Sequence, residues 1–169
     1  MTVKAIVASA LTLTIAAPAA AADRLPCGAG LVCASSPQSV LEVMRTLDKT
    51  AKVEPSDTKD PKIEMKSSEG LTYTVYFEDC DDGNTSCGSL NFRSTFSASK
   101  WGTLAHVNQF NLNKRMIKAS LLKDMGQQLD YDLSTVAGVS RANFVDLAKW
   151  WEQMLGEYSS YDPEGLKDD

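Results

Sequence analysis

The sequence predicts a single α+β domain in which helices cover one face of a mostly antiparallel sheet. Two observations predict this class. Apolar and polar residues alternate in two hairpin-like regions, residues 71–96 and 117–133. Three other segments, which begin near residues 36, 100 and 140, space their apolar residues three or four apart, as helices do. Because hairpins and helices are segregated along the chain, a parallel nucleotide-binding sheet is not expected.

The first 22 residues have the organisation of a secretory signal peptide. A basic start precedes an apolar run, and Ala20 and Ala22 fit positions −3 and −1 of a cleavage site. We therefore expect cleavage after Ala22, with cleavage after Ala19 as the alternative. A membrane anchor would need roughly 20 apolar residues, more than this run contains. The sequence predicts a periplasmic or secreted protein without a membrane anchor.

The exported part has the size of one domain. Residues 23–158 contain all the predicted elements, whereas residues 159–169 are polar, include a proline and a glycine, and are expected to be disordered. The full chain has a formal net charge of −5. Because phosphate backbones repel an acidic domain, nucleic acid is not an expected partner.

The first predicted helix begins near Ser36, with Pro37 in its first turn. One apolar stripe follows it at helical spacing: Val40, Val43, Met44 and Leu47. Short strands are expected at residues 51–54 and 63–66.

The first hairpin can be given a register from its side chains. We place Cys80 opposite Cys87 at the turn, next to an acidic loop. Apolar residues then meet on one face: Phe77 with Leu90, Val75 with Phe92, Tyr73 with Ser94, and Leu71 with Phe96. A slip of one residue would destroy this agreement, so the register is strongly specified.

Four cysteines outside the cytoplasm indicate two disulfides, for which three connectivities exist. The hairpin register favours Cys80–Cys87 and leaves Cys27–Cys33 as the second pair. Zinc sites use short C-x2–4-C pairs, whereas the spacings here are longer, so no metal is expected. No C-x-x-C redox motif is present.

A second helix is expected at residues 100–112, capped by Ser97 or Ser99. Its inward face would carry Leu104, Val107, Asn108 and Asn111. A second hairpin follows around Gly126, and its expected pairs are Leu121 with Leu129, Ala119 with Tyr131, and Ile117 with Leu133.

Ser140 is expected to cap the last helix. Its apolar stripe is long and has helical spacing: Phe144, Leu147, Ala148, Trp151, Met154, Leu155 and Tyr158.

Residues 60–158 resemble the YbjN family of bacterial proteins. The matching features include the strand at residues 70–77, the two cysteines that flank the acidic turn, and the spacing Asn-x-x-Asn-x-x-x-Arg formed by Asn108, Asn111 and Arg115. The resemblance implies a fold similar to type III secretion chaperones. It also implies a role in regulating sensory transduction, with no enzymatic activity. The export signal departs from family members that stay inside the cell.

Two groups of residues are candidate binding sites. Asn108, Asn111 and Arg115 share one helix face, so they form either a polar binding spot or structural amides that tie the helix to its neighbours. Trp150 lies at the edge of the last apolar stripe, beside Trp151. It is either an anchor for a partner or a side chain folded over the domain edge.

No catalytic site is expected. His106 is the single histidine and is predicted to lie on the surface, and no nucleophile motif surrounds any serine. Asp130 and Asp132 are expected on the solvated face of a strand. We therefore predict a non-enzymatic, cofactor-free module that binds a protein or peptide. A small-ligand binder, or a hydrolase, is the alternative.

Overall fold

The computed structural model describes residues 26–81, 86–99 and 102–161. The predicted signal peptide, the centre of the acidic turn and the last eight residues lie outside these ranges. The elements are, in order, β1 (Leu31–Val32), α1 (Pro37–Leu47), β2 (Val53–Pro55), β3 (Pro61–Lys66), β4 (Thr72–Glu78), β5 (Ser89–Phe96), α2 (Leu104–Asn113), β6 (Lys118–Leu121), β7 (Gln127–Ser134), β8 (Val139–Ser140) and α3 (Arg141–Ser159).

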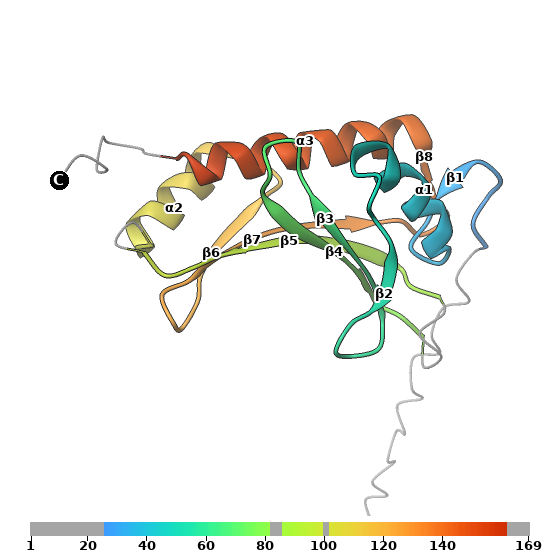
Figure 1. The fold of residues 1–169 in the computed structure, drawn as a ribbon, viewed down its shortest axis with the longest axis horizontal. Helices are drawn as coiled ribbons and strands as arrows, with labels where there is room; N and C mark the ends of the chain where they lie inside the picture. The colour runs from blue at the N-terminus through green and yellow to red at the C-terminus, as the bar shows by residue number, and fades with distance from the viewer. Residues whose placement is uncertain (1–25, 82–85, 100–101, 162–169) are drawn as a thin grey trace, which may run out of the picture.

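Six strands form one antiparallel sheet in the order β2-β3-β4-β5-β7-β6. Figure 1 shows α1 and the long α3 on one side of this sheet, with α2 at the end near β6. A separate pair, β1 with β8, holds the start of the domain against the start of α3. The predicted α+β class, with helices on one face of an antiparallel sheet, is confirmed.

The first hairpin has the predicted register. Phe77 pairs with Leu90 and Val75 with Phe92, but the ladder between β4 and β5 ends at Thr74 and Arg93. Beyond that point the expected pairs Tyr73–Ser94 and Leu71–Phe96 are not formed in the ladder. The Ser94 hydroxyl instead donates to the carbonyl of Thr72 at 2.8 Å, so a side-chain hydrogen bond joins the two strands there.

The second hairpin is shifted by two residues from the predicted register. Ala119 pairs with Leu129, and Leu121 with Gln127, because the turn closes tightly through a hydrogen bond from the N–H of Leu122 to the carbonyl of Gly126. A shift of two keeps every side chain on its original face. The apolar pattern alone therefore cannot exclude it.

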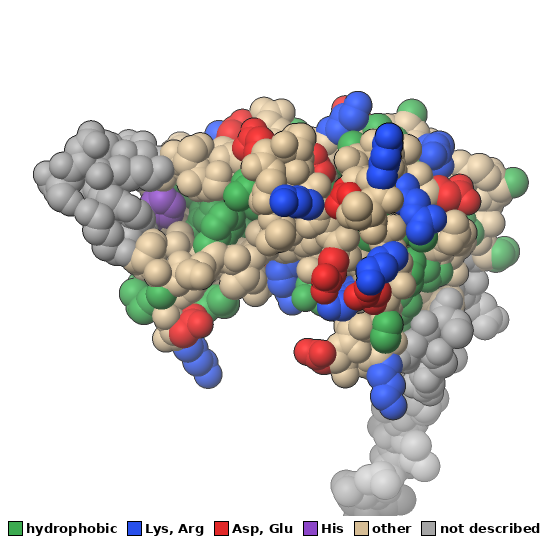
Figure 2. All heavy atoms as spheres, viewed as in Figure 1, with side chains coloured by type: hydrophobic (Ala, Val, Ile, Leu, Met, Phe, Trp, Pro, Cys, Tyr) green, Lys and Arg blue, Asp and Glu red, His purple; other side chains and the backbone are tan. Residues whose placement is uncertain are grey.

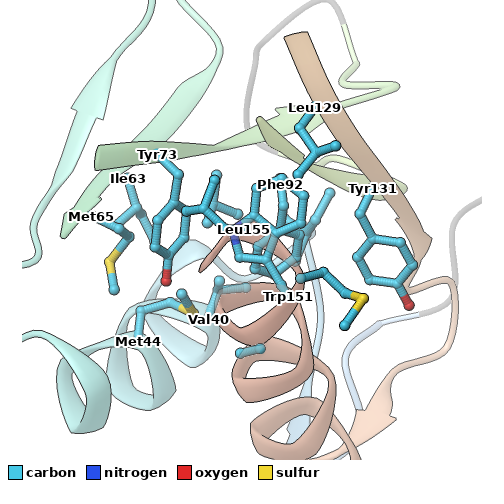
Figure 3. Close-up of a cluster of buried hydrophobic side chains, with 14 of the residues drawn as sticks. Val40, Met44, Ile63, Met65, Tyr73, Phe92, Leu129, Tyr131, Trp151 and Leu155 are labelled. Carbon is cyan, nitrogen blue, oxygen red and sulfur yellow. The ribbon is translucent and has the colours of Figure 1, made fainter. Parts of the chain in front are cut away.

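The core lies between the sheet and the two covering helices (Figure 3). Trp151 of α3 is fully buried, and its ring centroid lies 5.9 Å from those of Tyr73 on β4 and Phe92 on β5. Phe144 packs against Phe92 from the first turns of α3. Strands and helix thus meet through aromatic side chains at the centre of the domain.

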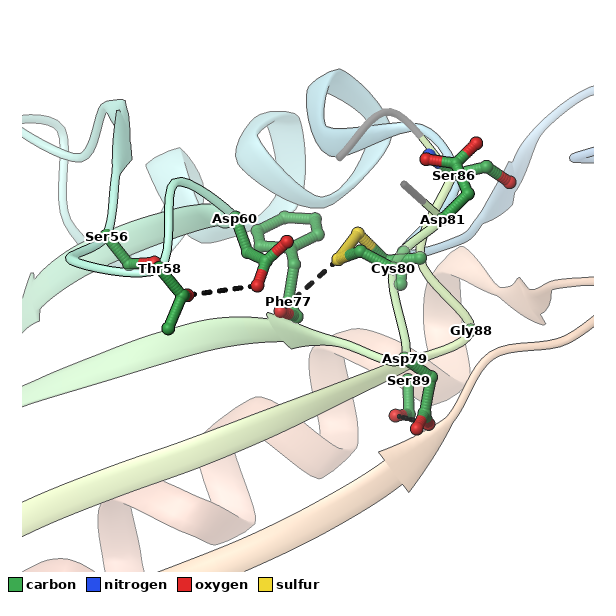
Figure 4. Close-up of a disulfide and its surroundings, with 12 residues drawn as sticks. Ser56, Thr58, Asp60, Phe77, Asp79, Cys80, Asp81, Ser86, Gly88 and Ser89 are labelled. Carbon is green, nitrogen blue, oxygen red and sulfur yellow. Dashed lines mark hydrogen bonds between the residues drawn. A yellow bond between two sulfur atoms is a disulfide. The ribbon is translucent and has the colours of Figure 1, made fainter. Parts of the chain in front are cut away.

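Both predicted disulfides are present, Cys27–Cys33 and Cys80–Cys87. The first closes the segment that enters β1. The second closes the turn between β4 and β5, where the Ser89 hydroxyl also donates to Asp79 at 2.6 Å (Figure 4). Disulfides are typical of proteins that fold outside the reducing cytoplasm.

Of the helices in residues 26–81, 86–99 and 102–161, none has the length and apolar content needed to cross a bilayer.

Candidate functional site

Helix α2 begins later than predicted, and this changes which face it buries. Thr103 is the N-cap, and its side-chain oxygen accepts a hydrogen bond from the backbone N–H of His106 at 3.1 Å. Helix α2 therefore begins at Leu104 rather than near residue 100, and Ser97 and Ser99 do not cap it. Its buried residues are His106, Val107 and Phe110.

The prediction of a surface histidine is wrong, because His106 lies on this buried face. Its ring packs edge-on against Tyr158 at 5.7 Å and Tyr161 at 5.3 Å between centroids. Phe110 contacts Tyr158 at 4.7 Å in the same way. Helix α2 packs against the end of α3 through these aromatic side chains. The aromatic contacts therefore determine the orientation of α2.

Tyr158 is the centre of this packing. Burial raises its pKa to about 12, so its hydroxyl stays protonated at neutral pH and donates to Gln127 Oε1 at 2.7 Å. This hydrogen bond links the end of α3 to the first residue of β7.

The outward face of α2 carries Leu104 and Asn108, which were expected on its inward face, whereas Val107 is buried as expected. Leu104 and Leu112 are each 72% exposed, and Asn108 is exposed between them. The three residues are spaced by four, so they share one side of the helix. Met116, 65% exposed, follows just beyond the helix end. We call Leu104, Asn108, Leu112 and Met116 the α2 outer face; Figure 2 shows hydrophobic side chains at this end of the molecule.

The three polar residues predicted as a site have different surroundings. Asn108 and Arg115 are exposed. The side-chain amide of Asn111 instead binds the backbone of Ala119 on β6. Its Nδ2 donates to the carbonyl at 3.0 Å, and its Oδ1 accepts from the N–H at 2.8 Å. Asn111 thus connects α2 to the sheet, while no side-chain hydrogen bond holds Asn108 or Arg115 within the described residues.

A second link fixes α2 to α3. Lys114, the C-cap of α2, donates to Glu157 at 2.5 Å. This contact, followed by a hydrogen bond from Gln153, holds the pKa of Glu157 below its usual range.

Trp150 is partly buried and packs against the core. Its ring lies 5.8 Å from that of Tyr131 on β7, edge-on at 70°. Helix α2, in contrast, contacts α3 about two turns later, at Tyr158. Trp150 and the α2 outer face therefore belong to different parts of the surface.

Sequence reasoning missed a charged cluster on the sheet face opposite the helices. The Asp130 side chain is only 1% exposed, although it was expected on a solvated face. It accepts hydrogen bonds at 2.7 Å from Arg93 Nε and from Gln128 Nε2, and Lys118 lies 3.9 Å away. The Arg93 guanidinium also lies over the Tyr76 ring, 5.3 Å from its centroid. The sequence did not indicate that β5 pairs with β7, and this pairing is what aligns Arg93 with Asp130.

These features define an α+β domain with a helical layer on one face of its sheet, an exposed apolar helix face, and a polar sheet face. The sequence profile of the YbjN family, described as "Putative bacterial sensory transduction regulator", matches residues 36–161. The chain therefore belongs to the YbjN family, as the resemblance implied.

Two solved structures are similar to this chain. One is YbjN from E. coli, described as "a putative transcription regulator", with 15% sequence identity and a TM-score of 0.51; the match covers 76% of this chain and 90% of that one. The other is the Yersinia pestis type III secretion chaperone SycH in complex with a fragment of YscM2. It has 15% identity and a TM-score of 0.48, and the match covers 73% of this chain and 98% of that one. No curated protein matches the sequence.

Proposed function

We propose that this protein is an exported, non-enzymatic module that binds a protein or peptide partner on the α2 outer face. The exposure of Leu104 and Leu112 carries the proposal. Large apolar side chains grouped on the surface of an otherwise charged domain are typical of interaction sites. Asn108, exposed between the two leucines, can add hydrogen bonds that orient the partner.

The charge near this face favours a partner segment with both apolar and acidic residues. Arg115 is exposed just after the helix, and the Lys118 side chain is 66% exposed at the start of β6. A carboxylate on the partner can approach these cations while its apolar side chains contact the leucines. Such complementarity increases association rate and specificity more than affinity.

Site-specific photo-crosslinking tests this surface. A benzophenone amino acid at position 112 should give a discrete adduct in the cell envelope. The same probe at Val136, which is apolar, 58% exposed and in the loop between β7 and β8, is the matched control. Figure 1 shows β8 at the opposite end of the molecule from α2. A real site yields an adduct at 112 and none at 136.

The adduct alone does not establish binding, so the identified partner must be purified and titrated. Replacing Leu104 and Leu112 together by serine should weaken its binding at least tenfold, because exposed hot-spot side chains each contribute upward of about 2 kcal/mol. Circular dichroism should show an unchanged fold, since both leucines are exposed. Equal binding by the variant and the unmodified protein would overturn the proposal.

Export is the second part of the proposal, and two disulfides and the pattern around Ala20 and Ala22 support it. Intact-mass spectrometry of protein from the envelope fraction should show a chain that begins at Asp23. Retention of Met1 in that fraction would contradict cleavage.

A further inference from the structure

The sheet face opposite α1 and α3 has a cavity of about 540 Å³. It lies around the end of the β4–β5 ladder, whose last pair is Thr74 with Arg93. This volume falls within the range of small-ligand sites, roughly 300–1,000 Å³. It is far larger than a surface irregularity that holds one or two waters.

Arg93 is the cation in this cavity whose charged group is held in place. Asp130, buried beneath the face, holds its Nε, and the Tyr76 ring supports the guanidinium plane. Within the described part of the chain, neither terminal nitrogen of Arg93 makes a hydrogen bond. A planar guanidinium with both terminal nitrogens available binds a carboxylate in two parallel hydrogen bonds.

The wall as a whole is largely polar, and its charged side chains sum to zero. Arg93 and Lys66 are balanced by Asp48 and Glu64, which also line the cavity. Hydrogen bonds from Thr50 lower the pKa of Asp48, and the hydrogen bond from Lys62 lowers that of Glu64, so both carry negative charge at neutral pH. A dianion such as phosphate would be repelled by these two groups.

Three threonine hydroxyls also face the cavity, from Thr72, Thr74 and Thr95. Within the described residues, none of these hydroxyls makes a hydrogen bond. Each can donate and accept one, as the neutral amide groups of a peptide require.

We propose that this cavity binds a small ligand with a single carboxylate and neutral amide groups, of the size of a di- or tripeptide, with the carboxylate on Arg93. Arg93 is the binding residue, and Asp130 is a positioning residue that fixes the guanidinium. This site is separate from the α2 outer face and does not depend on the function proposed for it.

Nuclear magnetic resonance titration with acetyl-trialanine tests the assignment. The free-acid form should shift the Arg93 Nε–H resonance and the backbone amides of Thr74 and Thr95 in a saturable way. The C-terminal amide of the same peptide differs only in the carboxylate, and it should cause no saturable shift. Inorganic phosphate should not bind either, because of Asp48 and Glu64.

Two variants distinguish this site from nonspecific attraction to positive charge. Arg93→Lys keeps the charge and can still pair with Asp130, but it lacks the planar fork, so affinity should fall about tenfold or more. Lys123→Gln removes an exposed charge that does not line the cavity, and it should leave affinity unchanged. Equal binding of acid and amide, tighter binding of phosphate, or full affinity in Arg93→Lys would each overturn the proposal.

Discussion

Asn111 shows how one side chain can substitute for a neighbouring strand. Its amide satisfies both the N–H and the carbonyl of Ala119, which is buried. A hydrogen bond of this kind contributes about 0.5–1.5 kcal/mol, and leaving a buried backbone group unpaired costs more.

Asn111→Ala should therefore lower the free energy of unfolding by roughly 1–3 kcal/mol, measured by urea denaturation. Asn108→Ala is the matched control, since Asn108 is exposed on the same helix and makes no hydrogen bond through its side chain within the described residues. A loss of stability as large for Asn108→Ala would show that general helix propensity, not the link to Ala119, explains the effect.

The two adjacent tryptophans should also respond differently. Trp151 is fully buried against Tyr73 and Phe92, so Trp151→Ala should cost roughly 3–5 kcal/mol of stability. Trp150 is only partly buried and contacts Tyr131. Trp150→Ala should leave the fold intact by circular dichroism and, if Trp150 is an additional anchor, weaken capture of the partner. Equal destabilisation by both substitutions would assign Trp150 to the core alone.

At the scale of elements, α2 is held by its two neighbours through different chemistry. Aromatic contacts and the Lys114–Glu157 ion pair join it to α3, and Asn111 joins it to β6. Of these links, the ion pair contains a carboxylate, which titrates in the acid range.

The pKa of Glu157 is lowered in the folded protein, chiefly by Lys114. Its stabilising contribution is therefore fully present above the ordinary carboxyl pKa of 4.5 and is lost as the pH falls through the lower, folded value. The difference in unfolding free energy between the unmodified protein and Glu157→Gln should be measurable at pH 7 and should shrink progressively as the pH falls below 4.5. Asp146→Asn, an exposed change on the same helix, is the control. A difference that persists unchanged at pH 3 would contradict the ion-pair explanation.

Element boundaries and faces could be predicted to different degrees. The β4–β5 register was predictable because Cys80, Cys87 and a run of alternating side chains all specify it. The β6–β7 register was not, since a shift of two residues leaves the inside and outside unchanged. The buried face of α2 was predicted only in part, because Thr103 moves the helix start: Val107 is buried as expected, whereas Leu104 is exposed.

At the scale of the whole molecule, the fold class followed from local patterns, whereas the sites did not. The Arg93–Asp130 pair requires β5 beside β7, two strands separated by α2 and β6 in the sequence. Such a non-local pairing cannot be detected from the spacing of apolar and polar residues within either segment. The exposed leucines of α2 have the same origin, because aromatic residues at the far end of the chain decide which side of α2 is covered.

Asn111 protects one edge of the sheet, which matters when the protein is concentrated. β6 is one edge of the six-stranded sheet, and an unprotected edge can recruit the strand of another molecule and start a fibril. At Ala119 the side chain of Asn111 already occupies the outward backbone groups. At the opposite edge, β2 ends in Pro55, which has no N–H to donate. With these protections at its two edges, the sheet is poorly suited to grow from one copy to the next, which favours solubility in a crowded compartment.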